Sequence, residues 1–350
     1  MKNQDFIIKS NQTILEALVK LNSLRDTSRL ILFVESNQSK IIGSLTDGDI
    51  RRSLIKDEDL YKSVEEVCFK NFIHEYEQDN FIQLEHFRKQ NISILPLLRK
   101  DNTLSRVIDL KKNKSIIPIE CMIMAGGRGK RLSPLTDKIP KPMLPLNGKP
   151  IIEYNIDRLI SYGIKKIYIS VKYLGEQIQD YFGDGSSKGI EIEYLWEDTP
   201  LGTAGALSLV REFKSDQVLL LNSDLFTDVN IEEMYLQLIN NNVDMVVAST
   251  EYKIDVPYAV FESDFQKVKA FKEKPTYIYH SNAGVYIFKK ELISKIPKRS
   301  YFDITDLMDL LIKENKEIRH SPIRGYWIDI GKPIDYKNAQ EFVKNINVEN

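Results

Sequence analysis

The sequence predicts an α/β protein in which a large, mostly parallel sheet follows a smaller α/β region. From about residue 117 onward, apolar runs of strand length alternate with amphipathic helical stretches, as in sheets covered by helices on both faces. The first 116 residues contain little Gly or Pro and repeat a shorter pattern. We therefore predict two regions, residues 1–116 (subdivided at about 1–58 and 59–116) and residues 117–350.

The composition excludes several classes of function. Hydrophobic residues make up 42% and charged residues 28%, as in a globular protein, and the net charge of -1 gives no basic face for nucleic acid. No apolar run approaches the roughly 20 residues that cross a bilayer. The start, MKNQDFIIKS, lacks the apolar core of a secretory signal. We expect a cytoplasmic protein with small-molecule partners and neither nucleic-acid nor membrane partners.

Cysteine and histidine give no sign of a metal cage or a catalytic base. The two cysteines, Cys68 and Cys121, lie among apolar residues, so we predict buried thiols. The four histidines are scattered without the spacing of metal ligands, and none is assigned to catalysis or zinc: His74, His86, His280 and His320.

The first region reads as one small unit that occurs twice. Residues 13–24 have apolar residues at helical spacing, and two strand-like runs and a turn entering a helix follow, at residues 30–34, 40–45 and 46–55. The second copy repeats this order more loosely, as a helix, a strand and a further apolar stretch at residues 80–90, 92–98 and 104–110. The spacing from Leu30 to Ile92 is about 60 residues, which is typical of supersecondary repeats that pack against each other.

This order and the stretch IIGSLTDGDIRR resemble a tandem pair of CBS domains. The resemblance implies an adenosine ligand near Gly43, Thr46 and Asp49, with the carboxylate accepting hydrogen bonds from ribose hydroxyls. In the second copy Arg106 replaces the glycine, so at most one ligand site is intact. The alternative is a capped turn in a pair that serves only for dimerisation. Because CBS pairs often associate face to face, we expect a homo-oligomer.

In the second region strands and helices follow one another in regular order. The predicted strands are residues 120–125, 166–171, 190–196, 218–222 and 245–250. The predicted helices are residues 151–163, 174–182, 205–213 and 231–240. Ligands of such a sheet bind beyond the carboxyl ends of its strands, so the loops after residues 125 and 222 are the first candidates for a site.

A glycine- and arginine-rich loop follows the first of these strands. Gly126, Gly127 and Gly129 allow a ligand to approach the backbone N–H groups, and Arg131 ends a run of three cations within four residues. Such a loop suits a polyphosphate. A dinucleotide fingerprint would need a third glycine near Leu132, and a Walker A loop would need Ser or Thr where this chain has Arg131.

The full segment, MAGGRGKRLSPLTDKIPKPMLPL, resembles the G-G-x-G-x-R-L-x-P-L-T…P-K-P-M-L-P motif of sugar-1-phosphate nucleotidylyltransferases. The resemblance covers roughly residues 119 to 340 and implies a Rossmann-like, mostly parallel nucleotidyltransferase domain. It implies that Gly126, Gly127 and Gly129 contact the nucleotide. It also implies that Arg131 neutralises the phosphates, including the leaving pyrophosphate, and that Lys141 contacts phosphate near the reacting centre.

The same resemblance implies a magnesium site. Two phosphate chains cannot be brought together without a hard cation, so carboxylates are expected at strand ends. Asp224 and Asp329 stand where the family has its metal ligands, in motifs written G-D-x-L and W-x-D-x-G-T. Asn222 and Ser223 depart from the commoner glycine, so the turn before Asp224 is uncertain while the carboxylate is retained.

Further motifs imply contacts to the base and the sugar. The stretch P-L-G-T-A-G implies Leu201, Gly202 and Thr203 against the nucleoside, and E-K-P implies Glu273 on sugar hydroxyls and Lys274 on the sugar phosphate. Asn282 in SNAGVYIF faces the sugar on the same grounds. Ala259 replaces the family's usual glycine, and its added methyl would press on the sugar.

The implied reaction is NTP plus sugar 1-phosphate giving NDP-sugar and pyrophosphate. The second pKa of a phosphate monoester is about 6, so no general base is needed. The combination of P-L-G-T-A-G with a CBS-like pair resembles bacterial guanylyltransferases of surface-polysaccharide and nonulosonic acid pathways and favours GTP; UTP, CTP and dTTP stay open. The rival is an adenine-nucleotide sensor whose second domain binds sugar nucleotides without catalysis. A third possibility is an enzyme tuned by a CBS ligand.

Overall fold

The computed structural model describes residues 3–24, 30–77 and 80–346. These residues separate into two compact units, Met1–Ile116 and Ile117–Asn350. Among the described residues, no helix has the length and apolar character needed to span a membrane.

The first unit contains two three-stranded sheets with the same strand order and directions. In each sheet the first two strands are parallel and the third is antiparallel to the second. The strands are β1 (Ile7–Lys9), β2 (Ile31–Glu35), β3 (Ile41–Thr46), β4 (Glu75–Tyr76), β5 (Ile94–Leu98) and β6 (Leu104–Asp109). The short helices are η1 (Asn3–Phe6), α1 (Ile14–Ser23), α2 (Asp47–Asp57), α3 (Val64–Val67) and α4 (Glu85–Lys89). The two sheets thus share one strand order, and the repeat of a CBS-like unit stays a prediction.

One helix of the first unit is much shorter than predicted. Residues 80–90 were expected to be helical throughout, but α4 covers only Glu85–Lys89. Ile82 instead forms a β-bridge with Ile116, and each residue donates a backbone hydrogen bond to the other. The apolar residues before α4 therefore hold the end of this unit in a strand-like pairing.

The second unit is built on a seven-stranded sheet with the order β11-β10-β7-β12-β17-β14-β18. Of these seven strands only β17 runs antiparallel to its neighbours, so the prediction of a mostly parallel sheet is confirmed. The strands are β7 (Glu120–Met124), β10 (Lys166–Val171), β11 (Glu191–Trp196), β12 (Gln217–Asn222), β14 (Met245–Asp255), β17 (Thr276–Lys289) and β18 (Ile318–Pro322).

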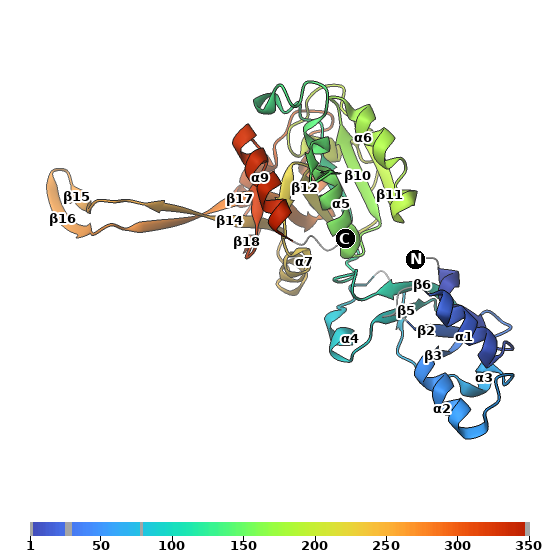
Figure 1. The fold of residues 1–350 in the computed structure, drawn as a ribbon. Helices are drawn as coiled ribbons and strands as arrows, with labels where there is room; N and C mark the ends of the chain where they lie inside the picture. Colours follow the sequence, from blue (N-terminus) through green and yellow to red (C-terminus); the bar gives the residue numbers. More distant parts are fainter. Residues whose placement is uncertain (1–2, 25–29, 78–79, 347–350) are drawn as a thin grey trace. The chain divides into compact units, whose positions relative to one another are not determined.

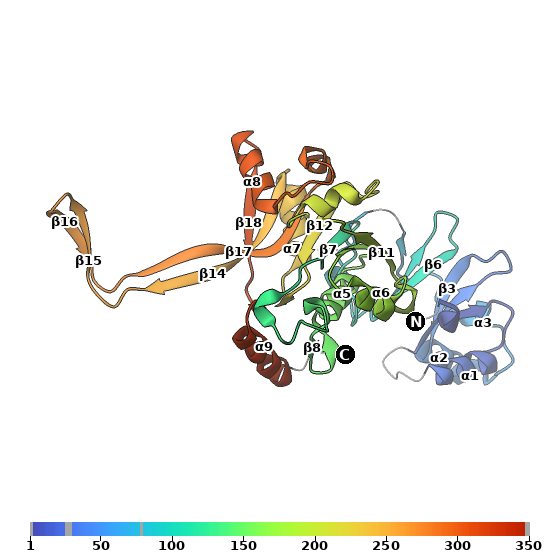
Figure 2. The ribbon, with the colours of Figure 1, turned by 90° about the horizontal axis from the view of Figure 1, so that it is seen from above.

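Helices cover both faces of this sheet. Figure 2 shows α8 on one side and α5 and α6 on the other. The α8 side buries a core that includes Met122, Leu220 and Phe288 from three neighbouring strands and Leu307 and Leu311 from the helix. The helices are α5 (Ile151–Ser161), α6 (Gly175–Phe182), α7 (Ile231–Asn240), α8 (Ile304–Lys313) and α9 (Pro333–Asn345).

Short elements complete the second unit. The 3₁₀ turns are η2 (Lys130–Leu132), η3 (Lys141–Met143), η4 (Ser186–Lys188), η5 (Gly205–Leu209) and η6 (Lys290–Lys295). The short strands are β8 (Pro145–Leu146), β9 (Lys149–Pro150), β13 (Leu225–Thr227), β15 (Val260–Asp264), β16 (Lys267–Lys272) and β19 (Trp327–Asp329).

The helix predicted over residues 205–213 is wrong in type and length. The structure has only the five-residue turn η5. The N–H groups of Ala204 and Gly205 both donate to the carbonyl of Phe302, at 2.9 Å. A Cβ on Gly205 would lie 2.5 Å from the carbonyl oxygen of Ser300, so this close backbone approach competes with a regular helix.

Both cysteines are free and buried, as predicted. Cys121 lies in the middle of the sheet on β7, and burial raises the pKa of its thiol well above the ordinary value. Burial also raises the pKa of Cys68. Neither thiol is therefore a reactive nucleophile at neutral pH.

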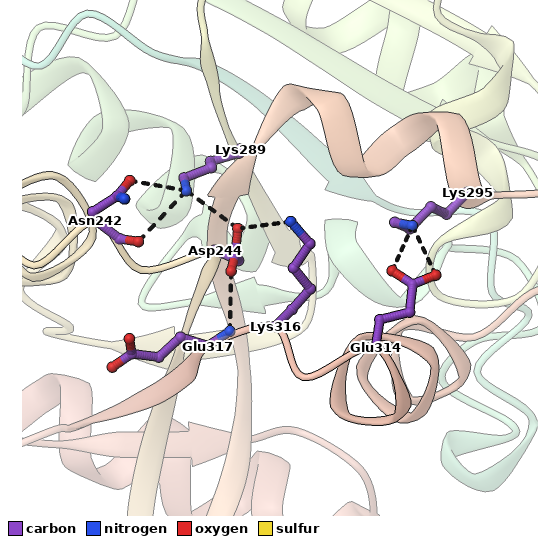
Figure 3. Close-up of polar contacts among 7 residues, drawn as sticks. All are labelled: Asn242, Asp244, Lys289, Lys295, Glu314, Lys316 and Glu317. Carbon is purple, nitrogen blue, oxygen red and sulfur yellow. Dashed lines mark hydrogen bonds and ion pairs between the residues drawn. The ribbon is translucent and has the colours of Figure 1, made fainter.

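A polar cluster fastens the sheet edge at the start of β14 (Figure 3). The Asp244 side chain is 11% exposed. Its carboxylate accepts a hydrogen bond from the Glu317 N–H at 3.0 Å and lies 3.2 Å from the Lys289 ammonium and 3.7 Å from that of Lys316. Burial alone would raise the pKa of Asp244, but the Glu317 N–H and the two lysines outweigh it and lower the pKa. One carboxylate thus joins the ends of β14, β17 and β18.

Strands β14 and β17 continue far beyond the rest of the sheet as a two-stranded ribbon (Figures 1 and 2). The strand predicted at residues 245–250 runs on to Asp255, and Ser249–Asp255 pairs with residues 276–282. The ribbon ends in the hairpin of β15 and β16, which pair with each other and with no other described strand. We call residues 250–281 the arm.

Candidate active site

The glycine- and arginine-rich loop leaves β7 at the carboxyl end of the parallel strands. Gly129 has a left-handed φ of 64°, and a Cβ there would lie 3.0 Å from the Cβ of Lys141, so conformation and space both favour glycine. The Thr136 hydroxyl donates to the Gly129 carbonyl at 2.9 Å and holds the turn. Gly127 and Arg131 are exposed, which leaves the outer side of the loop open to a ligand.

Two carboxylates meet beside this loop. Strands β13 and β19 pair antiparallel with Leu225 opposite Asp329, and the Ile330 N–H donates to the Asp224 carbonyl at 3.2 Å. The Lys141 ammonium forms an ion pair with the Asp224 carboxylate and lies 4.0 Å from Oδ1 of Asp329. We call Lys141, Asp224 and Asp329 the charged cluster.

The surroundings of the charged cluster raise the pKa of Asp329. Burial is the largest cause that raises the pKa of Asp329, and repulsion from Asp224 adds to it, while Lys141 and Arg131 pull the pKa down. The guanidinium of Arg131 lies close by, because a Cβ on Gly331 would be 3.8 Å from its two terminal nitrogens. Two adjacent carboxylates and two cations of this kind can bind a divalent ion and phosphate together.

The donor set fits magnesium when the remaining ligands come from substrate. Mg²⁺ is commonly held by one or two carboxylates together with waters and phosphate oxygens. Asp224 and Asp329 supply two such carboxylates, and Asp329 keeps 46% of its side chain exposed. In the part of the chain that the structure describes, no group of three or more His, Cys, Asp or Glu side chains could form an all-protein cage.

A carboxylate that the sequence analysis missed joins the two loops implied for nucleotide binding. A Cβ on Gly126 would lie 2.7 Å from Oε1 of Glu197, whose Oε2 accepts a hydrogen bond from the Leu201 N–H at 3.1 Å. Glu197 follows the end of β11 directly, and that position at a strand end was its only signal in the sequence.

The loop implied for the nucleoside is tied to α8. Leu201 is buried in the core, and the N–H and hydroxyl of Thr203 donate to Oδ1 of Asp303 at 2.8 and 3.0 Å. Burial alone would raise the pKa of Asp303, but hydrogen bonds from Thr203 and Tyr301 lower it. Gly202, with φ of 75°, fits closely against Phe302 and Asp303.

The residues implied for the sugar do not all lie together. Asn282 accepts a hydrogen bond from the Gly284 N–H at 3.0 Å, and Gly284 adjoins the Asn222 side chain near Asp224. The Trp327 indole donates to the Ala283 carbonyl at 2.8 Å and so links β17 to β19. Glu273, Lys274 and Ala259 instead belong to the arm, beyond Asn282, and the structure does not bring them to the charged cluster.

The three candidate ligand residues of the first unit have local partners. A Cβ on Gly43 would lie 2.6 Å from the Cys68 sulfur. The Thr46 hydroxyl accepts from the Asp49 N–H, and the Asp49 carboxylate accepts from the Thr46 N–H at 2.8 Å, which makes a capping box at the start of α2. Arg52 forms an ion pair with Asp49 at 2.6 Å. These contacts are those of a capped turn.

Comparison with known proteins identifies the second unit. The family model described as nucleotidyl transferase matches residues 120–346. The chain belongs to this family. The family match covers the loop, the charged cluster and the arm.

Curated relatives in this nucleotidyl transferase family differ in substrate. The chain is 34% identical over 230 residues to a D-glycero-alpha-D-manno-heptose 1-phosphate guanylyltransferase of Aneurinibacillus thermoaerophilus, covering 64% of this chain and 97% of that protein. It is 30% identical over 226 residues to the mannose-1-phosphate guanylyltransferase catalytic subunit beta of Danio rerio, covering 62% of each. It is 30% identical over 252 residues to a UTP–glucose-1-phosphate uridylyltransferase of Synechocystis, covering 66% of this chain and 65% of the relative.

The match to two of these relatives therefore spans less than two thirds of their length. Among solved structures, a Bacillus anthracis protein described as a glucose-1-phosphate thymidylyltransferase superposes with a TM-score of 0.53 at 24% identity, covering 66% of this chain and 98% of that one. This likeness shows the nucleotidyl transferase fold of the second unit.

Proposed function

We propose that the chain transfers a nucleotidyl group from an NTP to a sugar 1-phosphate and releases pyrophosphate. The observation that carries the proposal is the charged cluster, in which the Lys141 ammonium contacts Asp224 and approaches Asp329 at the end of the glycine-rich loop. Cations and paired carboxylates at one strand end suit a reaction between two phosphate groups. Membership of the nucleotidyl transferase family and the names of its relatives support the same reaction class.

In the proposed reaction an oxygen of the sugar phosphate attacks the α-phosphorus of the NTP, and the bond to the pyrophosphate oxygen breaks. The attacking phosphate is already largely ionised near neutral pH, so no base has to remove a proton. Arg131 would hold the leaving pyrophosphate, and Lys141 would neutralise charge at the reacting phosphate. Asp224 and Asp329 would hold Mg²⁺, which when bound neutralises phosphate charge.

The remaining roles follow the motifs. Gly126, Gly127 and Gly129 would give the triphosphate access to backbone N–H groups, and Leu201, Gly202 and Thr203 would line the nucleoside side. Asn282 would contact the sugar. The motifs assign Ala259 and Glu273 to the sugar and Lys274 to its phosphate, but the arm holds these three away from the charged cluster of their own chain. Glu197 joins the proposal as a positioning residue, because it contacts both glycine-containing loops.

We propose GTP as the nucleotide. Two of the relatives reported above are named guanylyltransferases, for mannose 1-phosphate and for a heptose 1-phosphate. The Synechocystis relative is named a uridylyltransferase, so UTP is the first alternative, with CTP and dTTP behind it. The sugar 1-phosphate is a precursor for surface polysaccharide or nonulosonic acid in this proposal.

For the first unit we propose a CBS-like pair that binds one adenine nucleotide near Gly43, Thr46 and Asp49. The repeated strand order of its two sheets supports the pair. The capping box of Thr46 and Asp49 favours the competing role of a scaffold. Regulation would require that the adenine nucleotide change kcat or KM, since allostery is a coupling between two sites.

The test is a turnover panel that follows pyrophosphate release. Four NTPs are offered with mannose, glucose, glucosamine and heptose 1-phosphates, each with Mg²⁺ and with or without 1 mM AMP or ATP. The proposal expects sugar-dependent release that is fastest with GTP. If no pair yields pyrophosphate and AMP or ATP binds tightly, the chain is instead a nucleotide sensor with a non-catalytic second domain.

A further inference from the structure

Glu273 and Lys274 lie too far along the arm to serve the charged cluster of their own chain. They follow β16 and precede β17, which begins at Thr276 and reaches the level of the cluster at Asn282. A strand advances about 3.3 Å per residue, so the six steps from Asn282 to Thr276 carry the backbone roughly 20 Å away. A lysine side chain is much shorter than this distance.

The arm cannot easily fold back to close the gap. From Ser249 paired with Asn282 to Asp255 paired with Thr276 the ladder is continuous, and the irregularity of β14 is confined to residues 247–249. Bringing Lys274 to its own cluster would break these backbone pairs and leave their N–H and C=O groups to find new partners. The ladder therefore holds the outer end of the arm away from the sheet, as both ribbon views show (Figures 1 and 2).

The arm exposes many large apolar side chains to solvent. Nine large apolar or aromatic side chains on it are each at least 42% exposed, and Phe265 at the tip is fully exposed. They are Tyr252, Ile254, Tyr258, Phe261, Phe265, Val268, Phe271, Ile278 and Tyr279. Tyr252 pairs directly with Tyr279 across the ribbon, and neighbouring exposed aromatic side chains of this kind mark an interaction site.

A groove that could receive such an arm lies at the sheet edge near its base. It has a volume of about 740 Å³ and runs between α8 and strands β14, β17 and β18. Its lining includes the apolar side chains Val247, Met308 and Ile312, and also Asn282. Because Asn282 is the inner residue implied for the sugar, an arm seated here would bring a second set of sugar contacts to it.

We propose that the arm docks in this groove on a second copy of the chain and places Glu273 and Lys274 at that copy's active site. Lys269 and Lys272 are paired with Asp264 and Glu262 within the arm, whereas Lys274 has no ion-pair partner among the described residues. Each copy thus carries a free cation that its own site lacks. In a two-fold arrangement each arm supplies Glu273 and Lys274 to the other copy's site, so both sites are complete.

This proposal rests on the proposed function, and mixed subunits test it. Arg131→Ala and Lys274→Ala chains with different affinity tags are co-expressed, and the mixed oligomer is isolated by two successive purifications. With exchanged arms, one of its two sites has both an intact loop and an intact arm. With the sugar 1-phosphate well below its KM, we expect about half of the wild-type rate of pyrophosphate release per oligomer. Arg131→Ala alone is nearly inactive, and Lys274→Ala alone is about 10- to 100-fold slower than wild type.

An arm that serves its own chain leaves both sites of the mixed oligomer defective. Activity no greater than that of the two single variants would overturn the proposal, and so would failure to recover any mixed oligomer. A mixture of Arg131→Ala with Lys269→Ala is the matched control: it gives about half of the wild-type rate under either arrangement, because Lys269 is paired within the arm.

A second experiment does not depend on activity. Chains bearing Lys274→Cys and differently tagged chains bearing Asn282→Cys are co-expressed, isolated as the mixed oligomer and treated with a short bifunctional thiol reagent. We expect a covalent product of twice the chain mass on a denaturing gel, and its absence would overturn the arm exchange. If wild type releases no pyrophosphate while this product forms, the proposed function fails and the exchange stands.

Discussion

The charged cluster and the arm carry side chains for the same proposed reaction, but they are held in different ways. Lys141, Asp224 and Asp329 come from three distant parts of the chain, and short strands that pack on a buried core bring them together. Glu273 and Lys274 stand on a ribbon held by backbone pairing, with exposed side chains. A motif therefore indicates which chemistry a residue suits, while packing decides which site it reaches.

The largest expected effect concerns the charged cluster. Asp224→Ala should lower kcat on the order of 10²- to 10³-fold, as for loss of a contact to charge that develops in the transition state. Circular dichroism should show the variant folded. The matched control is Asp216→Ala, an 81% exposed acid just before β12 that should leave kcat nearly unchanged. Equal activity of the two variants would remove the cluster from the mechanism.

The arm should show a smaller effect of a different kind. Lys274→Ala should lower kcat/KM for the sugar 1-phosphate about 10- to 100-fold, the range for a lost hydrogen bond to a charged group, and leave KM for the NTP unchanged. Lys269→Ala, on the same arm, should change neither constant. Steady-state kinetics with each substrate varied in turn gives the answer. An unchanged kcat/KM in Lys274→Ala would mean that the arm has no part in the site.

Ion pairs of the core and the arm should also differ in stability. Asp244→Asn should lower the free energy of unfolding by about 1–3 kcal/mol, because the buried carboxylate loses charged partners. Asp264→Asn, which breaks an exposed pair on the arm, should cost about 0–1 kcal/mol. Urea titrations measure both values, and equal costs would contradict the contrast.

The stability of Asp244→Asn should also depend on pH differently from that of wild type. The folded state lowers the pKa of Asp244, so its contribution is present above the unfolded-state value of about 3.9 and is lost as pH falls through the lower folded value. Asp244→Asn should therefore lose less stability than wild type on acidification over this window. Parallel acid unfolding curves for the two proteins would show that Asp244 is not the linked group.

A small effect on stability is expected at the cap of α2 in the first unit. Thr46→Ala should cost about 1 kcal/mol, because it removes the hydroxyl of the capping box, and Thr46→Ser should retain most of the stability. Urea unfolding of each variant supplies the numbers.

If the site also binds an adenine nucleotide, 1 mM ATP or AMP should raise the midpoint of thermal unfolding in wild type, and no shift would favour the scaffold role.

Much of the second unit could be predicted from the sequence because its strands are short apolar runs separated by amphipathic helices. The pattern failed at residues 205–213, where close contact of Gly205 with the chain at Ser300 and Phe302 replaces helical pairing. The arm was not foreseen either. Alternation such as Tyr252 and Ile254 with Lys253 and Asp255 normally indicates a half-buried strand, whereas both of these apolar side chains are exposed in the structure.

The residues of the candidate site also divide into those that a motif indicated and those that no motif indicated. Contiguous motifs located Arg131, Lys141 and Asp224 in the chain, and the roles assigned to them stay predictions. Glu197 carried no motif, and its contact with Gly126 depends on how two loops from neighbouring strand ends converge. Such contacts arise only when the sheet assembles, so spacing alone cannot indicate them.

Pyrophosphate release by Arg131→Ala, compared with Arg128→Ala, tests the central claim most directly. Both arginines are exposed in the same loop, but Arg131 lies beside Gly331 and influences Asp329, whereas Arg128 lies over the ring of Tyr173. With GTP and the best sugar 1-phosphate, Arg131→Ala should lose on the order of 10²- to 10³-fold in kcat while folded, and Arg128→Ala should stay near wild type. Near-normal kcat in Arg131→Ala would contradict the account.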